Sequence, residues 1–337
     1  MRIESRLILL IGPPRSGTTL LMRMLQAHSQ VYSRPEPHLF GPLAHLGYYD
    51  TVEKAPFDQF QAADAVRALV TDLPHGEQDY LDACRAYVDV LYSRLLDGKG
   101  GGRRYFVDKT PANALVLPFL TKLFPRAHYI VLTRHPAAVF SSYASSFFDG
   151  DYEAARRFNP ILNRYIPPMA ALLRERPVPL EHVRYEQLVM QPENEMRRLC
   201  RFLSLEFEPA MVEYGTQQLE GQGLGDPLTV NRQQRPVTDS IERWAPELAR
   251  SSEKLALVRE MLDAIDDRDL EAWGTPRPTL WQPLQAAGAA GEDNRIRWNR
   301  FLLQRKLLVW LRRDIHQRSH GRWIKRIRDA CDILLRG

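Results

Sequence analysis

Apolar and polar residues follow one another along the chain in blocks that are typical of buried strands joined to helices. Leu7–Ile11 is a continuous apolar run that ends at Gly12, and such a run indicates a strand buried on both faces of a parallel sheet. A turn rich in Gly, Pro and Ser leads into residues 18–28, whose apolar residues recur at helical spacing: Leu20, Leu21, Met24 and Leu25. The first 28 residues therefore predict a strand, a turn and a helix.

The same succession of strands and helices continues for most of the chain. Further short apolar runs predict strands over 104–107, 128–132 and 178–183. Apolar residues at helical spacing predict helices over roughly 78–96, 113–123, 137–147, 193–203 and 253–265. Strands that alternate with helices over this length predict an α/β fold with a central, mostly parallel sheet flanked by helices.

Charge is distributed unevenly over the 337 residues, which have a formal net charge of +5. From residue 294 onward there are 13 basic residues and three acidic ones, a net of +10, so residues 1–293 carry a net of −5. A polar stretch rich in Ala and Gly comes just before the basic segment. The sequence thus predicts a main domain over 1–284, a linker over 285–294 and a basic amphipathic helical tail over 295–337.

Cysteine content and hydropathy argue against several classes of protein. Cys84, Cys200 and Cys331 are widely spaced and form neither a disulfide framework nor a paired zinc motif, which favours a reducing compartment. No apolar run reaches the roughly 18 residues of a membrane span, and the first one is too short for a signal peptide. No cluster of His, Cys and acidic residues has metal-ligand spacing. These features predict a cytoplasmic protein without a metal site.

The loop after the first strand has the outline of a phosphate-binding loop. It reads Gly12-Pro-Pro-Arg-Ser-Gly-Thr-Thr19, and the backbone N–H groups of such a loop converge on an anion at the start of the next helix. A loop that hydrolyses ATP with Mg²⁺ carries a Lys before its last Ser or Thr. Thr18 stands at that position, and the nearest cation is Arg15. The loop therefore predicts an anion site without Mg²⁺-dependent ATP hydrolysis.

This loop resembles a known family. Pro14-Arg-Ser-Gly-Thr-Thr-Leu-Leu21 is similar to the 5′-phosphosulfate loop of sulfotransferases that use 3′-phosphoadenosine 5′-phosphosulfate (PAPS), in the Arg form of tyrosylprotein-sulfotransferase-like and related bacterial members. The resemblance implies a P-loop NTPase-like three-layer fold. It also implies that five residues hold the 5′-phosphosulfate: Arg15, Ser16, Gly17, Thr18 and Thr19.

Three later segments resemble the nucleotide site of the same family. An Arg at the end of a strand and a Ser eight residues on, here Arg134 and Ser142, resemble its 3′-phosphate site, and a guanidinium suits a phosphate monoester. In Val183-Arg-Tyr-Glu-Gln-Leu, Tyr185 matches a Tyr that lies against the nucleotide. In the polar loop over 225–244, Arg235 matches the cation of a loop that closes over PAPS.

Catalytic candidates follow from what sulfuryl transfer to a hydroxyl requires: a base at the acceptor and cations at the leaving oxygen. Glu36 follows a short second strand, at the place of the catalytic Glu in tyrosylprotein sulfotransferases. His38 is the alternative base, as His is in many other sulfotransferases. Arg15 and Lys109 are the leaving-group candidates, and Lys109 stands in Asp108-Lys-Thr-Pro111 at a strand end, where open parallel sheets bind ligands.

The resemblance extends over about residues 7–249 and implies a PAPS-dependent sulfotransferase. It would transfer a sulfuryl group to an acceptor hydroxyl and release adenosine 3′,5′-bisphosphate, without a metal. The alternatives are a P-loop nucleotide kinase or NTPase, and a non-catalytic binding module on the same fold. The acceptor would be a small molecule, a carrier-tethered chain or a peptide, and nucleic acid is not expected as a partner. The basic tail would pack on the body, form a homodimer, or dock on a carrier or membrane surface.

Overall fold

The computed structural model describes residues 3–34, 36–50, 58–216 and 234–287. Its strands are β1 Leu7–Ile11, β2 Val31–Ser33, β3 Tyr105–Asp108, β4 His128–Thr133 and β5 Leu180–Arg184. Its α-helices are α1 Thr18–Gln26, α2 Phe40–Ala44, α3 Gln59–Asp72, α4 Glu77–Asp97, α5 Leu117–Leu123, α6 Pro136–Phe147, α7 Tyr152–Phe158, α8 Ile161–Glu175, α9 Tyr185–Met190, α10 Pro192–Leu203, α11 Trp244–Ala249, α12 Ser252–Asp263, α13 Asp267–Trp273 and α14 Gln282–Ala286. Short 3₁₀ helices are η1 Ile3–Arg6, η2 Pro111–Val116, η3 Pro209–Met211 and η4 Tyr214–Thr216.

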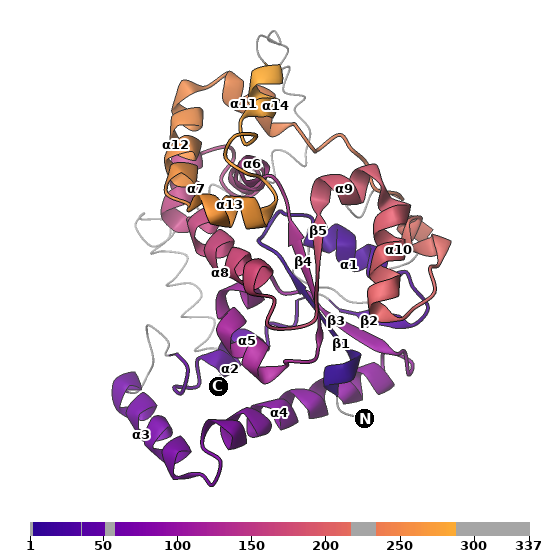
Figure 1. Cartoon of the computed structure of the whole chain (residues 1–337), viewed down its shortest axis with the longest axis vertical. Helices are drawn as coiled ribbons and strands as arrows, with labels where there is room; N and C mark the ends of the chain where they lie inside the picture. Colours follow the sequence, from indigo (N-terminus) through magenta and orange to yellow (C-terminus); the bar gives the residue numbers. More distant parts are fainter. Residues whose placement is uncertain (1–2, 35, 51–57, 217–233, 288–337) are drawn as a thin grey trace, which may run out of the picture.

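The five strands form one parallel sheet in the order β2-β3-β1-β4-β5. Helices cover both of its faces, with α1, α9 and α10 on one side and α5, α6 and α8 on the other (Figure 1). The predicted α/β fold with a central parallel sheet is therefore confirmed. All of its carboxyl strand ends point the same way, so the segments that follow β1 to β5 gather at one edge.

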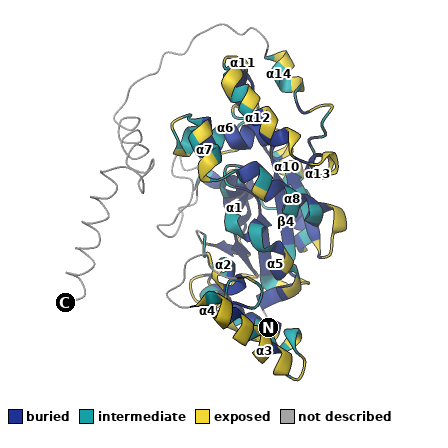
Figure 2. Ribbon diagram, turned by 90° about the vertical axis from the view of Figure 1, so that its left-hand side faces the viewer, coloured by how far each residue is buried: buried dark blue, intermediate teal, exposed yellow. Residues whose placement is uncertain are grey.

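The apolar run of β1 explains the three layers. Leu7, Leu9 and Ile11 belong to the core on one face of the sheet, and Ile8 and Leu10 belong to the core on the other face. All five side chains are fully buried, because successive residues of a strand point to opposite faces and both faces are covered. Figure 2 shows the strands as buried, whereas α3 and α4 are largely exposed at one end of the molecule.

One predicted helix differs from the structure. The helix expected over 113–123 is divided into η2 and α5, with Pro118 in the first turn of α5. Proline has no N–H to donate to the carbonyl one turn earlier but is tolerated in the first turn of a helix, so Pro118 favours the start of a new helix at this position. The 3₁₀ helix η2, which follows Lys109, packs against both α2 and α8.

Residues 288–337 lie outside the described part of the chain, and they include most of the predicted linker and the whole basic tail. The division into domain, linker and tail therefore stays a prediction. Within the described residues, no helix is long and apolar enough to cross a membrane.

Candidate functional site

The loop after β1 has the features of an anion site. Gly17 is the N-cap of α1, its φ is 102°, and no side chain caps the helix there. The first backbone N–H groups of a helix have no partner within the helix, so an uncapped start favours an anion. Ser16 is fully buried and donates its hydroxyl to the carbonyl of Pro13 at 2.9 Å, which fixes the turn from within.

Tyr185 packs directly against this loop. A β-carbon at Gly17 would lie 2.4 Å from Cδ2 of the Tyr185 ring, so only glycine leaves room for the ring. Gly17 is thus required twice, by its positive φ and by its neighbour. From the sequence, Gly17 and Tyr185 were both expected to contact the same nucleotide. In the structure the two residues are in contact with each other.

Arg15 connects the loop to α6. Its Nε donates to the hydroxyl of Ser142 at 3.2 Å, although the two residues are 127 positions apart. Arg15 also has a φ of 70°, in the left-handed region that non-glycine residues seldom adopt. A residue expected at the 5′-phosphosulfate is therefore in contact with a residue expected at the 3′-phosphate.

Arg134 is a buried cation with neutral partners. Its side chain donates to the carbonyl of Arg15 at 3.1 Å and to the carbonyl of Ser240 at 2.6 Å, and its guanidinium lies over the Tyr185 ring at 4.4 Å. The residue is 8% exposed, its Nε lacks a hydrogen-bond partner, and no ion pair in the described part of the chain involves it. Burial lowers the pKa of Arg134 from its usual value, because the charged form loses hydration.

Such a group is unusual in a folded protein, because a buried charge is generally paired with an opposite one. The unpaired guanidinium beside an anion loop therefore points to a second anion at this position.

A second group of predicted residues meets at the ends of β2 and β3. Lys109 is 1% exposed, and its ammonium lies 2.6 Å from a carboxylate oxygen of Glu36. Nε2 of His38 lies 3.3 Å from the other carboxylate oxygen. The strands pair in parallel with Ser33 opposite Val107, so the segments that follow them start side by side. Glu36 thus contacts both His38, the alternative base, and Lys109, the predicted leaving-group cation.

Ser240 is a site residue that the sequence did not single out. Its hydroxyl lies 2.6 Å from the hydroxyl of Tyr185, and its carbonyl accepts from Arg134. It stands in the late loop that was expected to close over the nucleotide, five residues after Arg235. Arg235 itself is exposed and adjoins residues 217–233, which the structure does not describe, so its role stays a prediction.

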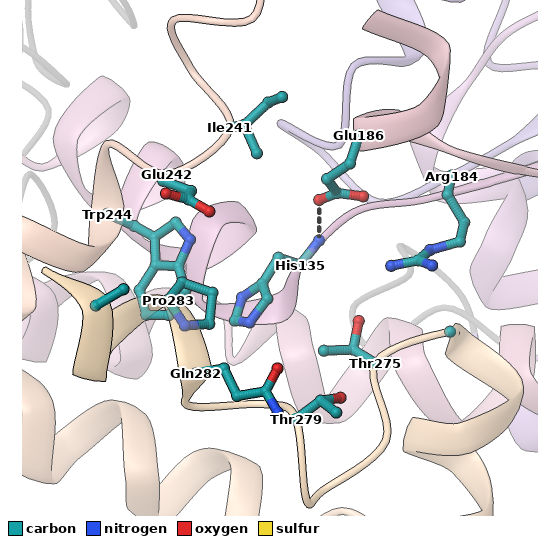
Figure 3. Close-up of a pocket in the computed structure, with 12 residues that line it drawn as sticks. His135, Arg184, Glu186, Ile241, Glu242, Trp244, Thr275, Thr279, Gln282 and Pro283 are labelled. Carbon is teal, nitrogen blue, oxygen red and sulfur yellow. Dashed lines mark hydrogen bonds between the residues drawn. The ribbon is translucent and has the colours of Figure 1, made fainter. Parts of the chain in front are cut away.

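A cavity of about 400 Å³ adjoins the site at His135, the residue after Arg134. Figure 3 shows His135 at its centre, stacked on Trp244 at 4.3 Å, while its backbone N–H donates to Glu186 at 2.8 Å and Arg184 faces in from the opposite side. Burial lowers the pKa of His135 to about 4, so the ring is neutral near pH 7. The cavity is lined by neither Glu36 nor Lys109, so it is separate from the predicted catalytic group.

The described residues include no group of three or more His, Cys, Asp or Glu side chains that could hold a metal ion.

Comparison with known proteins decides the family. The model described as "Sulfotransferase family" matches residues 8–209, which is more than half of the chain. The chain belongs to the sulfotransferase family.

Relatives of this sulfotransferase include proteins from bacteria and animals. It is 30% identical over 281 residues to the nodulation protein NoeE of Sinorhizobium fredii (strain NBRC 101917 / NGR234), covering 76% of this chain and 63% of NoeE. It is 28% identical over 269 residues to protein-tyrosine sulfotransferase 1 of Danio rerio, covering 76% of this chain and 70% of that protein. The chain thus spans less than two thirds of the length of NoeE.

Among solved structures, the sulfotransferase domain from the Synechococcus PCC 7002 olefin synthase is similar with a TM-score of 0.48 and 21% identity, over 77% of this chain and 95% of that one. The family membership confirms the predicted enzyme class, a sulfotransferase. A nucleotide kinase and a non-catalytic module are accordingly not favoured.

Proposed function

We propose that this sulfotransferase transfers the sulfuryl group of PAPS to an acceptor hydroxyl and releases adenosine 3′,5′-bisphosphate. The observation that carries the choice of donor is Arg134, a buried guanidinium without a carboxylate partner beside the anion loop. ATP lacks a 3′-phosphate, whereas PAPS has one, so an unpaired cation at this place fits PAPS better.

The nucleotide would be held by two groups of residues. The backbone of Arg15–Thr19 and the start of α1 would bind the 5′-phosphosulfate. Arg134 and Ser142 would bind the 3′-phosphate, with Tyr185 and Ser240 against the nucleoside. Arg235 would approach from the late loop. Because Arg134 already donates to the carbonyl of Arg15, binding at one anion position would orient the other.

The catalytic step would use the group at the ends of β2 and β3. As the acceptor oxygen bonds to sulfur, Glu36 would take the hydroxyl proton, and the bond from sulfur to the bridging phosphate oxygen would break. Lys109 and Arg15 would stabilise the negative charge that develops on this bridging oxygen. His38 is the alternative base, and its contact with Glu36 also allows it to orient that carboxylate.

The acceptor would be a hydroxyl-bearing molecule. Because relatives of this chain include protein-tyrosine sulfotransferases, an acceptor panel should contain tyrosine peptides as well as carrier-tethered and small-molecule alcohols.

We further propose that the basic tail over 295–337 serves assembly or docking, since none of the proposed site residues lies in it. Deletion of the tail tests this. Loss of solubility or dimerisation would indicate assembly, and loss of acceptor turnover alone would indicate docking.

Calorimetry tests the donor. We expect adenosine 3′,5′-bisphosphate to bind at least tenfold more tightly than AMP, because a charge-assisted bond to a phosphate is worth roughly 1.5–3 kcal/mol. Equal binding of the two nucleotides would exclude the proposed 3′-phosphate site. Turnover of Mg²⁺-ATP, with no transfer from labelled PAPS to any acceptor of the panel, would instead favour a nucleotide hydrolase.

A further inference from the structure

A second carboxylate, Asp108, lies next to Lys109 in sequence and is fully buried. It accepts hydrogen bonds from three neutral groups: the Tyr92 hydroxyl at 2.5 Å, the Thr110 hydroxyl at 2.9 Å and the Asn113 amide at 3.2 Å. Burial raises the pKa of Asp108, and these three bonds oppose that rise by stabilising the carboxylate. Asp108 is thus satisfied by neutral donors.

Lys109 has a different partner. Its ammonium contacts Glu36 at 2.6 Å, on the segment that follows β2. Because Asp108 is occupied by its own donors, the ammonium is directed to Glu36 rather than to the adjacent carboxylate. Because Asp108 and Glu36 have separate partners, Lys109 stays paired with Glu36 at the place where the acceptor would react.

Thr110 connects these two arrangements. Its hydroxyl donates its single hydrogen to Asp108, and the same oxygen accepts from the backbone N–H of His38 at 3.4 Å. His38 has a φ of 52°, a strained conformation for a non-glycine residue that persists only when surrounding contacts enforce it. The Thr110 hydroxyl is such a contact, because it joins the end of β3 to the segment that carries Glu36.

We infer that Thr110 is a positioning residue, which holds Glu36 in register with Lys109 through the backbone of His38. The inference rests on the proposed function, since it assigns Glu36 and Lys109 to the reaction. Thr110 is buried and touches neither the anion loop nor Arg134 among its described contacts. Its loss should therefore affect the chemical step and spare nucleotide binding. Misplacement of a catalytic group by about 1 Å can cost on the order of 10²-fold in rate.

The test compares Thr110→Val, which keeps the shape and removes the hydroxyl, with Thr110→Ser, which keeps the hydroxyl. Ser33→Ala is the matched control, because Ser33 is a buried residue of β2 whose hydroxyl bonds to the Val107 carbonyl instead. We expect Thr110→Val to lower kcat at least tenfold while KM for PAPS and the Kd for adenosine 3′,5′-bisphosphate stay within twofold. Thr110→Ser should recover most of the loss, and Ser33→Ala should change little.

Labelling of Lys109 with a small amine reagent, read by peptide mass spectrometry, tests the same inference without turnover. The paired, buried ammonium should react slowly in the wild type and several-fold faster in Thr110→Val, with Ser33→Ala unchanged. The labelling experiment distinguishes the positioning role of Thr110 from the proposed use of PAPS. If the enzyme did not use PAPS, the labelling difference would still be expected.

Two results would overturn the positioning role. One is Thr110→Val with wild-type kcat and wild-type labelling. The other is an equal loss in Tyr92→Phe, which removes a donor from Asp108 but leaves the bond between Thr110 and His38. In that case the role would belong to the buried Asp108 cluster as a whole. If Thr110→Val failed to fold, Thr110→Ala would replace it: a loss in Thr110→Ala with near-normal Thr110→Ser and Tyr92→Phe would support the role of Thr110, and an equal loss in Tyr92→Phe would count against it.

Discussion

The ammonium of Lys109 and the carboxylate of Glu36 lie 2.6 Å apart, with the Lys side chain 1% exposed and the Glu side chain 13% exposed. A pair this well shielded from water is not an ordinary surface salt bridge, which contributes little and is easily screened. Removal of one partner leaves the other charge buried and uncompensated. The pair is therefore both a structural element at the end of β3 and, in the proposed reaction, the base together with the leaving-group cation.

We expect Glu36→Gln to lower kcat by about 10²-fold or more, because the amide cannot take the acceptor proton and base catalysis contributes roughly 10²–10⁴-fold. Binding of adenosine 3′,5′-bisphosphate should stay nearly normal. Steady-state kinetics and calorimetry on the same preparation measure both. Glu77→Gln is the control for the loss of a charge, because Glu77 forms a more exposed 2.8 Å pair with Lys122 away from the site.

The same experiment decides between the two candidate bases. His38→Asn should retain a measurable rate if His38 only orients Glu36 through the 3.3 Å contact. The opposite pattern, near-normal turnover in Glu36→Gln and its loss in His38→Asn, would assign the base to His38.

Gly17→Ala should weaken nucleotide binding tenfold or more and destabilise the fold by about 1–3 kcal/mol. The new β-carbon would lie 2.4 Å from the Tyr185 ring, and the φ of 102° is unfavourable for alanine. Gly41→Ala is a suitable control, because a β-carbon there would meet nothing within 4 Å. Calorimetry and thermal unfolding of the two variants provide the comparison. Similar behaviour of the two would show that close packing at Gly17 is unimportant.

Much of this architecture could be predicted, because local pattern and family motifs specify it. The continuous apolar run of Leu7–Ile11 requires that both faces of the sheet are covered. Because the strands are parallel, the residues that follow them lie at the carboxyl edge of the sheet, irrespective of how the helices are arranged. Ser240 and Thr110 could not be found in this way. Their roles arise from contacts with Tyr185 and His38, which are 55 and 72 positions away. Neither residue type has a local pattern that distinguishes it from an ordinary loop hydroxyl.

The helix α8 shows a second limit of local pattern. It runs through Pro167 and Pro168, which interrupt the helical signal in the sequence. Eight of its side chains are nevertheless buried against the sheet and neighbouring helices, and this burial offsets the lost backbone bonds. Tertiary packing therefore decides that residues 161–175 form a helix, and a short stretch of the sequence does not contain the information about this packing.

Arg134→Gln should abolish the preference for adenosine 3′,5′-bisphosphate over AMP by weakening the first and leaving the second nearly unchanged. The reason is that the amide cannot replace the charge that would face the 3′-phosphate. Calorimetry with both nucleotides measures the ratio of the two Kd values. Arg184→Gln serves as control, since Arg184 is a partly buried Arg at the neighbouring strand end that lines the cavity of Figure 3. A retained preference in Arg134→Gln would place the 3′-phosphate elsewhere.

Two buried histidines should make the protein acid-sensitive. Burial lowers the pKa of His135 and of His182 from 6.5 to about 4, and nearby Arg residues contribute, including Arg184 for both. Below pH 6.5 the unfolded chain takes up protons at these positions and the folded chain does not, so the unfolded state is favoured progressively. Each histidine should therefore cost about 2 kcal/mol of stability between pH 7 and pH 5.

Thermal unfolding at pH 7 and pH 5 tests this contribution with the variant His135→Gln. Glutamine does not titrate in this range, so the fall in Tm between the two pH values should be smaller in the variant than in the wild type. Its Tm at pH 7 should still be lower, because the stacking on Trp244 at 4.3 Å is lost. The decisive quantity is the difference between the two proteins in the fall of Tm from pH 7 to pH 5, and not the Tm of either protein at one pH. An equal fall in both proteins would mean that His135 takes up its proton over the same pH range in the folded and unfolded chains, and that the Leu280 carbonyl, 2.9 Å from its Nε2, offsets the effect of burial.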